Sequence, residues 1–239
     1  MAKDYFRFKL FTVRQDRCAM KVGVDGTLLG AWAGVDGCRR VLDVGAGTGL
    51  IALMLAQRNT EVGVDAVDID GEACRQAAEN VAGSPFAGRV CVWQASFADF
   101  VSRVSSKYDL VVSNPPYFVR SLRNPDPLRS IARHTVSLSA EDILSKHREL
   151  LGQGGRIALI LPAAAPEGDP ERMADENGMY VTRRTSVVTL RGAGVKRVLA
   201  EFSPIRLHAC VSDTLVIEEA HGLYSSAYVE LTKDFYLNF

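Results

Sequence analysis

The chain has 239 residues, 47% of them hydrophobic, a length that suits one full α/β core and is short for two independent domains. Lysine and arginine total 28, and so do aspartate and glutamate; the zero net charge excludes a strong overall attraction to nucleic acid or membranes, so a polyanion site must be a local patch. The five cysteines form no C-x-x-C pair, which predicts reduced thiols in a cytoplasmic protein and no metal site. The first ten residues include charged ones, and Pro162 interrupts the longest apolar run, so we expect no signal peptide and no membrane span.

The first 39 residues precede the repeating part of the chain. Residues 5–11 alternate in YFRFKLF, a turn is expected at Arg14-Gln15-Asp16, and the strand resumes in CAMKV. A helix is predicted over Thr27–Ala33. We therefore interpret residues 1–39 as a hairpin-and-helix extension and residues 40–239 as the core of a single domain, 1–239.

From Arg40 onward, short runs of β-branched residues alternate with helical stretches. The strand-like runs are VLDVG, VDAVDI, RVCVWQ, YDLVVS and IALILP. Continuous apolar runs of this kind are typical of parallel strands that are buried on both faces. After Gly178, which ends a charged helix, MYVTRRTSVVTL and KRVLAEFS are separated by RGAG and predict an antiparallel pair at the sheet edge. The predicted fold class is α/β, with a doubly wound, mostly parallel, seven-stranded sheet.

The first core strand leads directly into a glycine-rich turn, Asp43-Val44-Gly45-Ala46-Gly47-Thr48-Gly49, and a helix follows over Leu50–Arg58. Glycines allow a sharp turn and the close approach of a ligand to the helix N-terminus. The turn also satisfies a loose dinucleotide pattern, so by itself it leaves both NAD and S-adenosylmethionine open. Asp43 favours a cationic amino-acid or sulfonium group over a pyrophosphate, which it would repel. The alternative is that Asp43 only caps the turn.

Acidic and aromatic residues follow the next two strands. Asp68 ends the second strand, 19 residues after Gly49, where a carboxylate can accept hydrogen bonds from both ribose hydroxyls of an adenosine cofactor. We expect Ile69 beside it in the cofactor site and Asp70 to be a solvated or capping acid, although both aspartates could be caps. Ser96 and Phe97 follow the third strand, where the adenine would lie, and Phe97 either packs on the ring or belongs to the core.

The fourth strand ends in Asn114-Pro115-Pro116-Tyr117, the most specific motif in the chain. A conjugated amine is a poor nucleophile until its lone pair is freed from the π system. Asn114 Oδ1 and the carbonyl of Pro115 or Pro116 can each accept one N–H of such an amine and draw the nitrogen toward tetrahedral geometry. The prolines fix these acceptors in place, and Tyr117 offers a flat face to a planar substrate. The motif predicts methylation of a planar nitrogen, and the alternative is an ordinary proline turn.

These motifs, in this order, resemble those of the class I methyltransferases. Within that class the sequence is similar to the bacterial family that methylates N6 of the adenine just 3′ of the anticodon, position 37, in valine tRNA. The similarity covers nearly the full chain, including Phe11-Thr12-Val13-Arg14-Gln15, Ala132-Arg133-His134 and the closing residues 232–239. The resemblance implies S-adenosylmethionine as cofactor and tRNA as partner. Where the family usually has an acid at the end of the third strand, this chain has Ser96, which predicts weaker cofactor binding.

The resemblance and the motifs together nominate three groups of residues. Catalysis is assigned to Asn114, Pro115, Pro116 and Tyr117. Cofactor binding is assigned to Asp43, Gly45, Ala46, Gly47, Gly49, Asp68, Ile69, Ser96, Phe97 and Asn114. Contacts with the RNA are assigned to Tyr117, Phe118, Arg120, Arg123, Arg133 and His134, although a lone histidine often satisfies a backbone group instead. We expect no metal ligands and a monomer.

Basic residues are concentrated in three segments despite the zero total. Residues 1–21 carry net +4, residues 119–134 net +3 and residues 183–206 net +5. These segments could surround the pocket and contact phosphates, or they could simply be solvated faces. Residues 119–136 also form the longest stretch without clear periodicity, and a loop of that length is usually functional or mobile.

Three other functions remain to be weighed. An enzyme that methylates a protein glutamine amide would need the same acceptors, but such enzymes usually carry a larger N-terminal domain than the residues before the first core strand allow. A catalytically inactive nucleotide-binding or RNA-binding module would not require the intact Asn114–Tyr117 motif. An NAD oxidoreductase would leave that motif unexplained.

Overall fold

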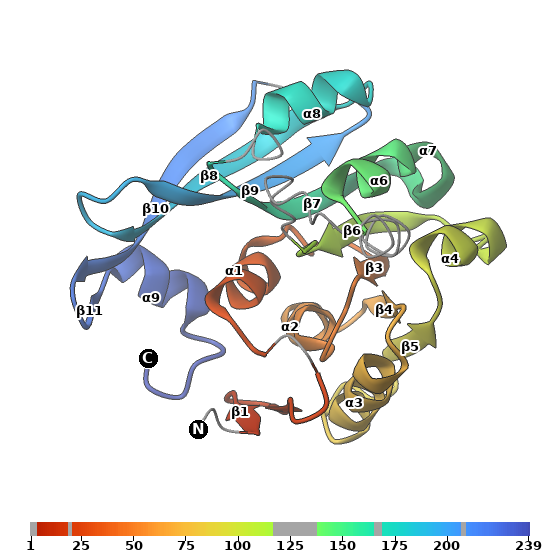
Figure 1. The fold of residues 1–239 in the computed structure, drawn as a ribbon, viewed down its shortest axis with the longest axis horizontal. Helices are drawn as coiled ribbons and strands as arrows, with labels where there is room; N and C mark the ends of the chain where they lie inside the picture. Colours follow the sequence, from red (N-terminus) through yellow and green to blue (C-terminus); the bar gives the residue numbers. More distant parts are fainter. Residues whose placement is uncertain (1–3, 19–20, 117–137, 165–168, 207–208) are drawn as a thin grey trace, which may run out of the picture.

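The computed structural model describes residues 4–18, 21–116, 138–164, 169–206 and 209–239 (Figure 1). The described chain forms one large sheet with helices on both faces, preceded by a separate two-stranded hairpin. The predicted α/β class with a mostly parallel, doubly wound sheet is confirmed. None of the described helices has the length and apolar character needed to span a bilayer.

The large sheet has nine strands in the order β11-β10-β8-β9-β7-β6-β3-β4-β5. Five of them, which match the five predicted apolar runs, are mutually parallel: β3 (Arg40–Val44), β4 (Gly63–Asp68), β5 (Val90–Gln94), β6 (Tyr108–Ser113) and β7 (Leu151–Pro162). The predicted hairpin is β8 (Tyr180–Leu190) with β9 (Val195–Ser203), and β9 runs antiparallel to both β7 and β8.

The prediction of seven strands, with the β8–β9 pair at the edge, was wrong. β10 (Val211–Ala220) pairs in parallel with β8, and the short β11 (Leu223–Tyr224) pairs with β10, so the sheet continues beyond the hairpin. Only Leu215 and Ile217 of β10 are buried. Its apolar run, Leu215-Val216-Ile217, is only three residues long and is followed by two glutamates, so the strand depends on its pairing with β8 for its place in the sheet.

Helices cover both faces of the sheet and divide the core into two clusters (Figure 1). One face carries α1 (Val24–Trp32), α2 (Leu50–Arg58), α3 (Gly71–Ala82) and α9 (Ser226–Thr232); the other carries α4 (Phe97–Arg103), α6 (Ala140–Ser145), α7 (His147–Leu150) and α8 (Pro170–Glu176). Successive residues of one strand reach opposite faces, as Val41 and Leu42 of β3 do. Helix α1 begins at Val24, three residues before the predicted start.

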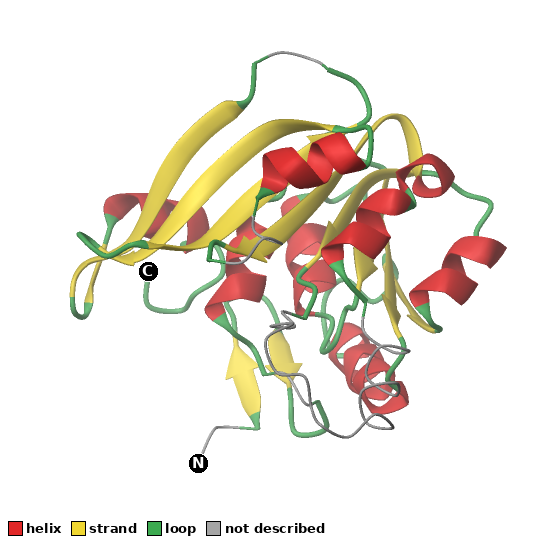
Figure 2. Cartoon of the chain, turned by 45° about the horizontal axis from the view of Figure 1, so that its top comes forward, coloured by secondary structure: helices red, strands yellow, loops and turns green. Residues whose placement is uncertain are grey.

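The N-terminal hairpin differs from the prediction in its turn. Strands β1 (Tyr5–Arg7) and β2 (Thr12–Arg14) pair antiparallel, so the chain reverses between Arg7 and Thr12 and not at Arg14-Gln15-Asp16 (Figure 2). Phe8 and Phe11, in this turn, are both buried and their rings stack with centroids 4.8 Å apart. Burying two phenylalanines in the core is worth several kcal/mol, roughly 1.5–3 each, which decides where the chain turns.

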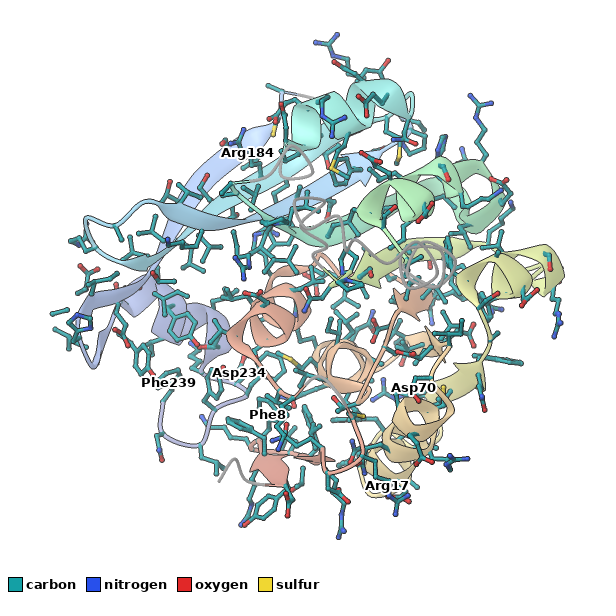
Figure 3. The ribbon with its side chains drawn as sticks, viewed as in Figure 1. Phe8, Arg17, Asp70, Arg184, Asp234 and Phe239 are labelled. Carbon is teal, nitrogen blue, oxygen red and sulfur yellow. The ribbon has the colours of Figure 1, made fainter. Side chains whose placement is uncertain are left out.

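Both ends of the described chain meet at this hairpin. Tyr236 stacks on Phe8 with centroids 5.9 Å apart, and Phe239 packs edge-on against Tyr236. Lys9 Nζ donates to the carbonyls of Lys233 and Phe239, and the Lys9 backbone N–H donates to the Phe235 carbonyl. Phe8 and Phe239, from opposite ends of the chain, are labelled in the lower half of Figure 3. The C-terminal tail is therefore part of the core that holds the hairpin.

Candidate active site

A cavity of about 540 Å³ opens at the carboxyl ends of β3, β4, β5 and β6. This is the edge where doubly wound sheets bind ligands. Its walls come from four parts of the chain: Cys18 from the N-terminal segment; Val44, Gly45, Gly47, Val67, Asp68, Ile69, Asp70 and Ala73 around the glycine turn and α3; Ala95, Ser96, Phe97 and Ala98 at α4; and Asn114, Pro116, Leu138, Asp142, Ser145 and Lys146 beside β6 and α6.

The glycine turn is held by backbone hydrogen bonds to β4. The N–H groups of Gly45 and Ala46 both donate to the Val67 carbonyl, at 2.9 and 3.1 Å. Gly49 is the N-cap of α2 with φ of 79°, and a Cβ there would stand 3.3 Å from Ala77 Cβ on α3. A Cβ at Gly47 would meet no described atom within 4 Å, since that residue faces the cavity. The turn thus leaves its backbone open to a ligand.

Asp43 acts as a cap at the start of α2, which was the alternative to a cofactor contact in the sequence analysis. The side chain is fully buried, and Oδ2 accepts the Ala52 N–H in the first turn of α2 at 3.0 Å. Among the described residues, nothing donates to Oδ1, and Asp43 does not line the cavity. The pKa of this carboxyl is raised to about 7, chiefly by burial and to a smaller extent by the Asp68 charge, against the lowering effect of the Ala52 hydrogen bond. Contact of Asp43 with a cofactor stays a prediction.

Asp68 lines the cavity and organises the turn around it. Its Oδ2 accepts the Gly47 N–H at 2.8 Å, and its Oδ1 accepts the Asp70 N–H at 2.9 Å. A carboxylate oxygen has a second lone pair, so both oxygens can still accept hydrogen bonds from a ligand. Asp70 caps α3 by accepting the Glu72 N–H, as expected for a capping acid, and it also lines the cavity (Figure 3).

The part of the cavity expected to hold an adenine is largely apolar. Ile69, half exposed, and Phe97 both line it, with Ala95 and Ala98 nearby in the chain. Ser96 lines it too, but its hydroxyl caps α4: Oγ accepts the Asp99 N–H at 3.1 Å and donates to Asp99 Oδ2 at 2.7 Å. Because the hydroxyl donates to Asp99 and accepts one hydrogen bond from it, one lone pair remains that can accept a hydrogen bond from an adenine amine.

The Asn-Pro-Pro motif directly follows β6 at the same edge of the sheet. Ser113, the last residue of β6, donates its hydroxyl to the Val44 carbonyl at 2.7 Å, which ties the end of β6 to the end of β3. Asn114 and Pro116 line the cavity, whereas Pro115 is buried. The structure therefore brings the motif together with Gly47 and Asp68. Six predicted site residues, Tyr117, Phe118, Arg120, Arg123, Arg133 and His134, lie outside the described residues, as does the whole 119–136 segment.

Several residues of the cavity were missed by the sequence analysis. Cys18 lines it, and burial, followed by the nearby charges of Asp70 and Asp68, raises the pKa of its thiol to about 11. Asp142 and Ser145 lie on α6, Leu138 precedes its N-cap and Lys146 is its C-cap. The Ser139–Asp142 capping box is a local signal for the start of that helix, but nothing local shows that the helix faces a ligand.

Most arginines of the basic 183–206 segment already have partners within the chain. Arg184, Arg191 and Arg197 form ion pairs with Glu171, Glu219 and Asp25 respectively, and the Arg183 guanidinium stacks over the Trp32 ring at 4.2 Å. These contacts favour a role for the arginines in stabilising the fold over a role in binding phosphates.

The lining of the cavity suits an adenosine cofactor. Asp68 offers carboxylate acceptors for ribose hydroxyls, and Ile69 and Phe97 offer an apolar surface for an adenine. Among the described residues, no group of three histidine, cysteine or acidic side chains could hold a metal ion.

Comparison with known proteins agrees with this geometry. Residues 33–169 match the family described as methyltransferase small domain. A protein of Parabacteroides distasonis is 49% identical over 237 residues, covering 99% of both chains, and one of Aeromonas hydrophila is 46% identical over 233 residues, covering 97% of both. Each is named tRNA1(Val) (adenine(37)-N6)-methyltransferase.

Solved structures share the fold. A protein described as a predicted O-methyltransferase from Agrobacterium tumefaciens has a TM-score of 0.60 at 19% identity, covering 88% of this chain and 96% of that one. A ribosomal protein L11 methylase from Lactobacillus delbrueckii has a TM-score of 0.50 at 21% identity, covering 77% of each chain. At these identities the likeness concerns the fold alone.

Proposed function

Because the chain belongs to the tRNA1(Val) (adenine(37)-N6)-methyltransferase family, an assignment carried by relatives 43–49% identical over almost its whole length, we propose that it methylates N6 of adenine 37 in the anticodon loop of valine tRNA. Its methyl donor is S-adenosylmethionine. We place this activity in the cytoplasm, where tRNA is modified.

One observation carries the proposal: Asn114 and Pro116 line the same cavity as Gly47, Asp68 and Phe97. The residues suited to a target amine and those suited to an adenosine cofactor therefore border one continuous space. Asn114 Oδ1 and a proline carbonyl each accept a hydrogen bond from one N–H of the amine, which lowers the cost of freeing the nitrogen lone pair as it attacks. The tie between Ser113 and Val44 fixes the acceptors relative to the glycine turn.

The remaining residues of the cavity bind and orient the cofactor. When bound, S-adenosylmethionine supplies a methyl group that is already activated by a positive sulfur, so the amine needs neither a metal nor a strong general base. Asp68 accepts from the ribose hydroxyls while its hydrogen bonds to Gly47 and Asp70 keep it in place. Ile69 and Phe97 cover the adenine of the cofactor and exclude water.

An unpaired loop base is the substrate that fits these acceptors. An adenine within a duplex cannot present its amine to a cavity in the protein, whereas a base in an anticodon loop can be turned out at modest cost and held by stacking. We assign that stacking to Tyr117, which follows Pro116 directly in the chain.

The direct test is mass spectrometry of nucleosides from unmodified valine tRNA after incubation with enzyme and S-adenosylmethionine. The expected product is one N6-methyladenosine per tRNA, at position 37, and a transcript with guanine at that position should remain unmethylated. Methylation of another base, or of a glutamine in a protein extract offered in parallel, would overturn the proposed substrate.

A further inference from the structure

The N-terminal hairpin presents one face to the core and the other to solvent. In the β1–β2 ladder, Tyr5 lies opposite Arg14 and Arg7 opposite Thr12. All four of these residues are exposed, whereas Phe6 and Val13, which alternate with them, turn toward the core. We call Tyr5, Arg7, Thr12 and Arg14 the hairpin face; it contains two positive charges and no carboxylate.

The guanidinium groups of this face are not used to stabilise the fold. Among the described residues, no carboxylate forms an ion pair with Arg7 or Arg14, in contrast to Arg184, Arg191 and Arg197, each of which has an acidic partner. An exposed arginine without an internal partner keeps its full capacity for bidentate bonds to a phosphate. Within the described part of the chain, the hairpin arginines therefore differ from those of the β8–β9 segment in having no acidic partner.

The hairpin is fixed rigidly to the glycine turn through one buried side chain. Asn80 on α3 is 3% exposed; its Oδ1 accepts the Arg14 N–H at 2.8 Å, and its Nδ2 donates to the Arg14 carbonyl at 3.0 Å and to the Thr48 carbonyl at 2.9 Å. A single amide thus joins the backbone of β2 to the turn that borders the cavity. Asn80 therefore connects the hairpin face to the active site.

The chain after Arg14 runs along α3 toward the cavity. Gln76 Oε1 accepts the Arg17 N–H at 3.0 Å, Arg17 pairs with Glu79 beside the helix (Figure 3), and Cys18 reaches the cavity wall. The Asn80 bond to Thr48 and the place of Cys18 in the cavity wall therefore put the hairpin beside the cavity, where one RNA molecule can contact both.

We propose that the hairpin face binds the phosphate backbone of the double-helical stem next to the loop that carries the target base. The inference rests on the proposed RNA substrate. Arginine, tyrosine and threonine side chains are all phosphate or sugar ligands in nucleic-acid complexes, and such contacts set the position of a nucleic acid without reading its sequence. The face orients the stem while the cavity receives the base, which accounts for a positive patch on a chain with zero net charge.

The test compares the affinity of valine tRNA for the wild-type protein and for the double variant Arg7→Ala/Arg14→Ala over a range of salt concentrations. Alanine retains both backbone groups of Arg14 that bond Asn80. Loss of two phosphate contacts should weaken binding roughly 10-fold or more at low salt and reduce the slope of log K against log salt by about 2. The dissociation constant of S-adenosylmethionine should change less than about twofold, because the hairpin face lies outside the cofactor cavity.

A matched control removes the same charge elsewhere. Arg39→Ala/Arg191→Ala deletes two exposed arginines, at the opposite end of β3 and at the end of β8, and should leave tRNA affinity and its salt slope unchanged. An RNA consisting of the anticodon loop without its stem should bind the wild-type protein and the Arg7→Ala/Arg14→Ala variant equally.

Three results would overturn the inference: an unchanged salt slope in the Arg7→Ala/Arg14→Ala variant, an equal loss in the control variant, or an equal loss with the stemless loop. Binding is measured independently of methyl transfer, so the two proposals can fail separately. Absence of N6-methyladenosine with a normal hairpin effect refutes the substrate base alone, whereas normal methylation with no hairpin effect refutes the hairpin face alone.

Discussion

At the scale of single residues, Asn114 is expected to act mainly in the transition state. Its acceptor is best used when the target nitrogen loses planarity, so Asn114→Ala should lower kcat roughly 100-fold while the affinity for S-adenosylmethionine changes far less. Single-turnover methylation of valine tRNA, with calorimetry for the cofactor, measures both. Near-normal turnover in a variant with wild-type thermal stability would contradict the assignment.

Asp68 is expected to bind the ribose of the cofactor. Asp68→Ala removes a charged acceptor and should weaken S-adenosylmethionine binding by about 1.5–3 kcal/mol. Because Asp68 also accepts the Gly47 N–H, Asp68→Asn serves as a second variant that keeps one acceptor for that turn. Calorimetry in the presence of a chelator gives the affinities. If NAD bound tightly and S-adenosylmethionine did not bind, the cofactor assignment would be wrong.

Asp43 gives the fold a pH dependence. Its carboxyl has a pKa of about 7 in the fold, against about 4 in an unfolded chain, because burial disfavours the charge. Between these values the folded protein holds a proton that the unfolded chain has lost, so the free energy of unfolding should fall as pH rises from about 4 to about 7. Urea unfolding of Asp43→Asn, whose amide oxygen can still accept from Ala52, should lack this component, and an identical pH slope in both proteins would refute it.

At the scale of elements, Asn80 joins the hairpin, α3 and the glycine turn. Asn80→Ala leaves the Arg14 N–H and the Arg14 and Thr48 carbonyls without their partner, at a cost of about 1–3 kcal/mol for a buried polar group. Urea unfolding measures the loss. Glu79→Ala, next to it but exposed, is the control and should cost less than about 1 kcal/mol, the usual worth of a surface ion pair. Equal losses of unfolding free energy in the two variants would mean that the Asn80 hydrogen bonds contribute no more than a surface ion pair.

At the scale of the whole molecule, the two ends of the chain stabilise each other. Deleting residues 236–239 removes the Tyr236 ring from Phe8 and one of the two carbonyls bonded by Lys9 Nζ. Tyr236 and Phe239 are partly buried against the core, so their loss should cost about 1.5–3 kcal/mol, which corresponds to a fall in Tm of roughly 3–12 °C for a chain of this length. Calorimetry measures the shift. Leu237→Ala, at an exposed position, should change Tm by little, and an equally stable truncated protein would show that the tail contributes nothing.

The sequence by itself determined the parts of the molecule whose signals are local. Five apolar runs predicted five parallel strands, because strands buried on both faces need continuous apolar residues. The glycine turn, Asp68 and the Asn114 motif each follow a strand, and the carboxyl ends of parallel strands share one edge, so their meeting at one cavity could be predicted. Relatives that match nearly the whole chain confirm the family that the flanking residues indicated.

Only the tertiary structure decided the features that depend on distant partners. β10 is held by its pairing with β8, and α6 reaches the cavity because its apolar side packs on the sheet. The turn of the hairpin lies where Phe8 and Phe11 find a buried site, and Asp43 caps α2 because the chain returns to place Ala52 beside it. In each case the deciding free energy comes from burial or from a hydrogen bond to a particular partner, and the local pattern does not decide whether that partner is in place; for Asp43 it left a cofactor contact and a cap both open.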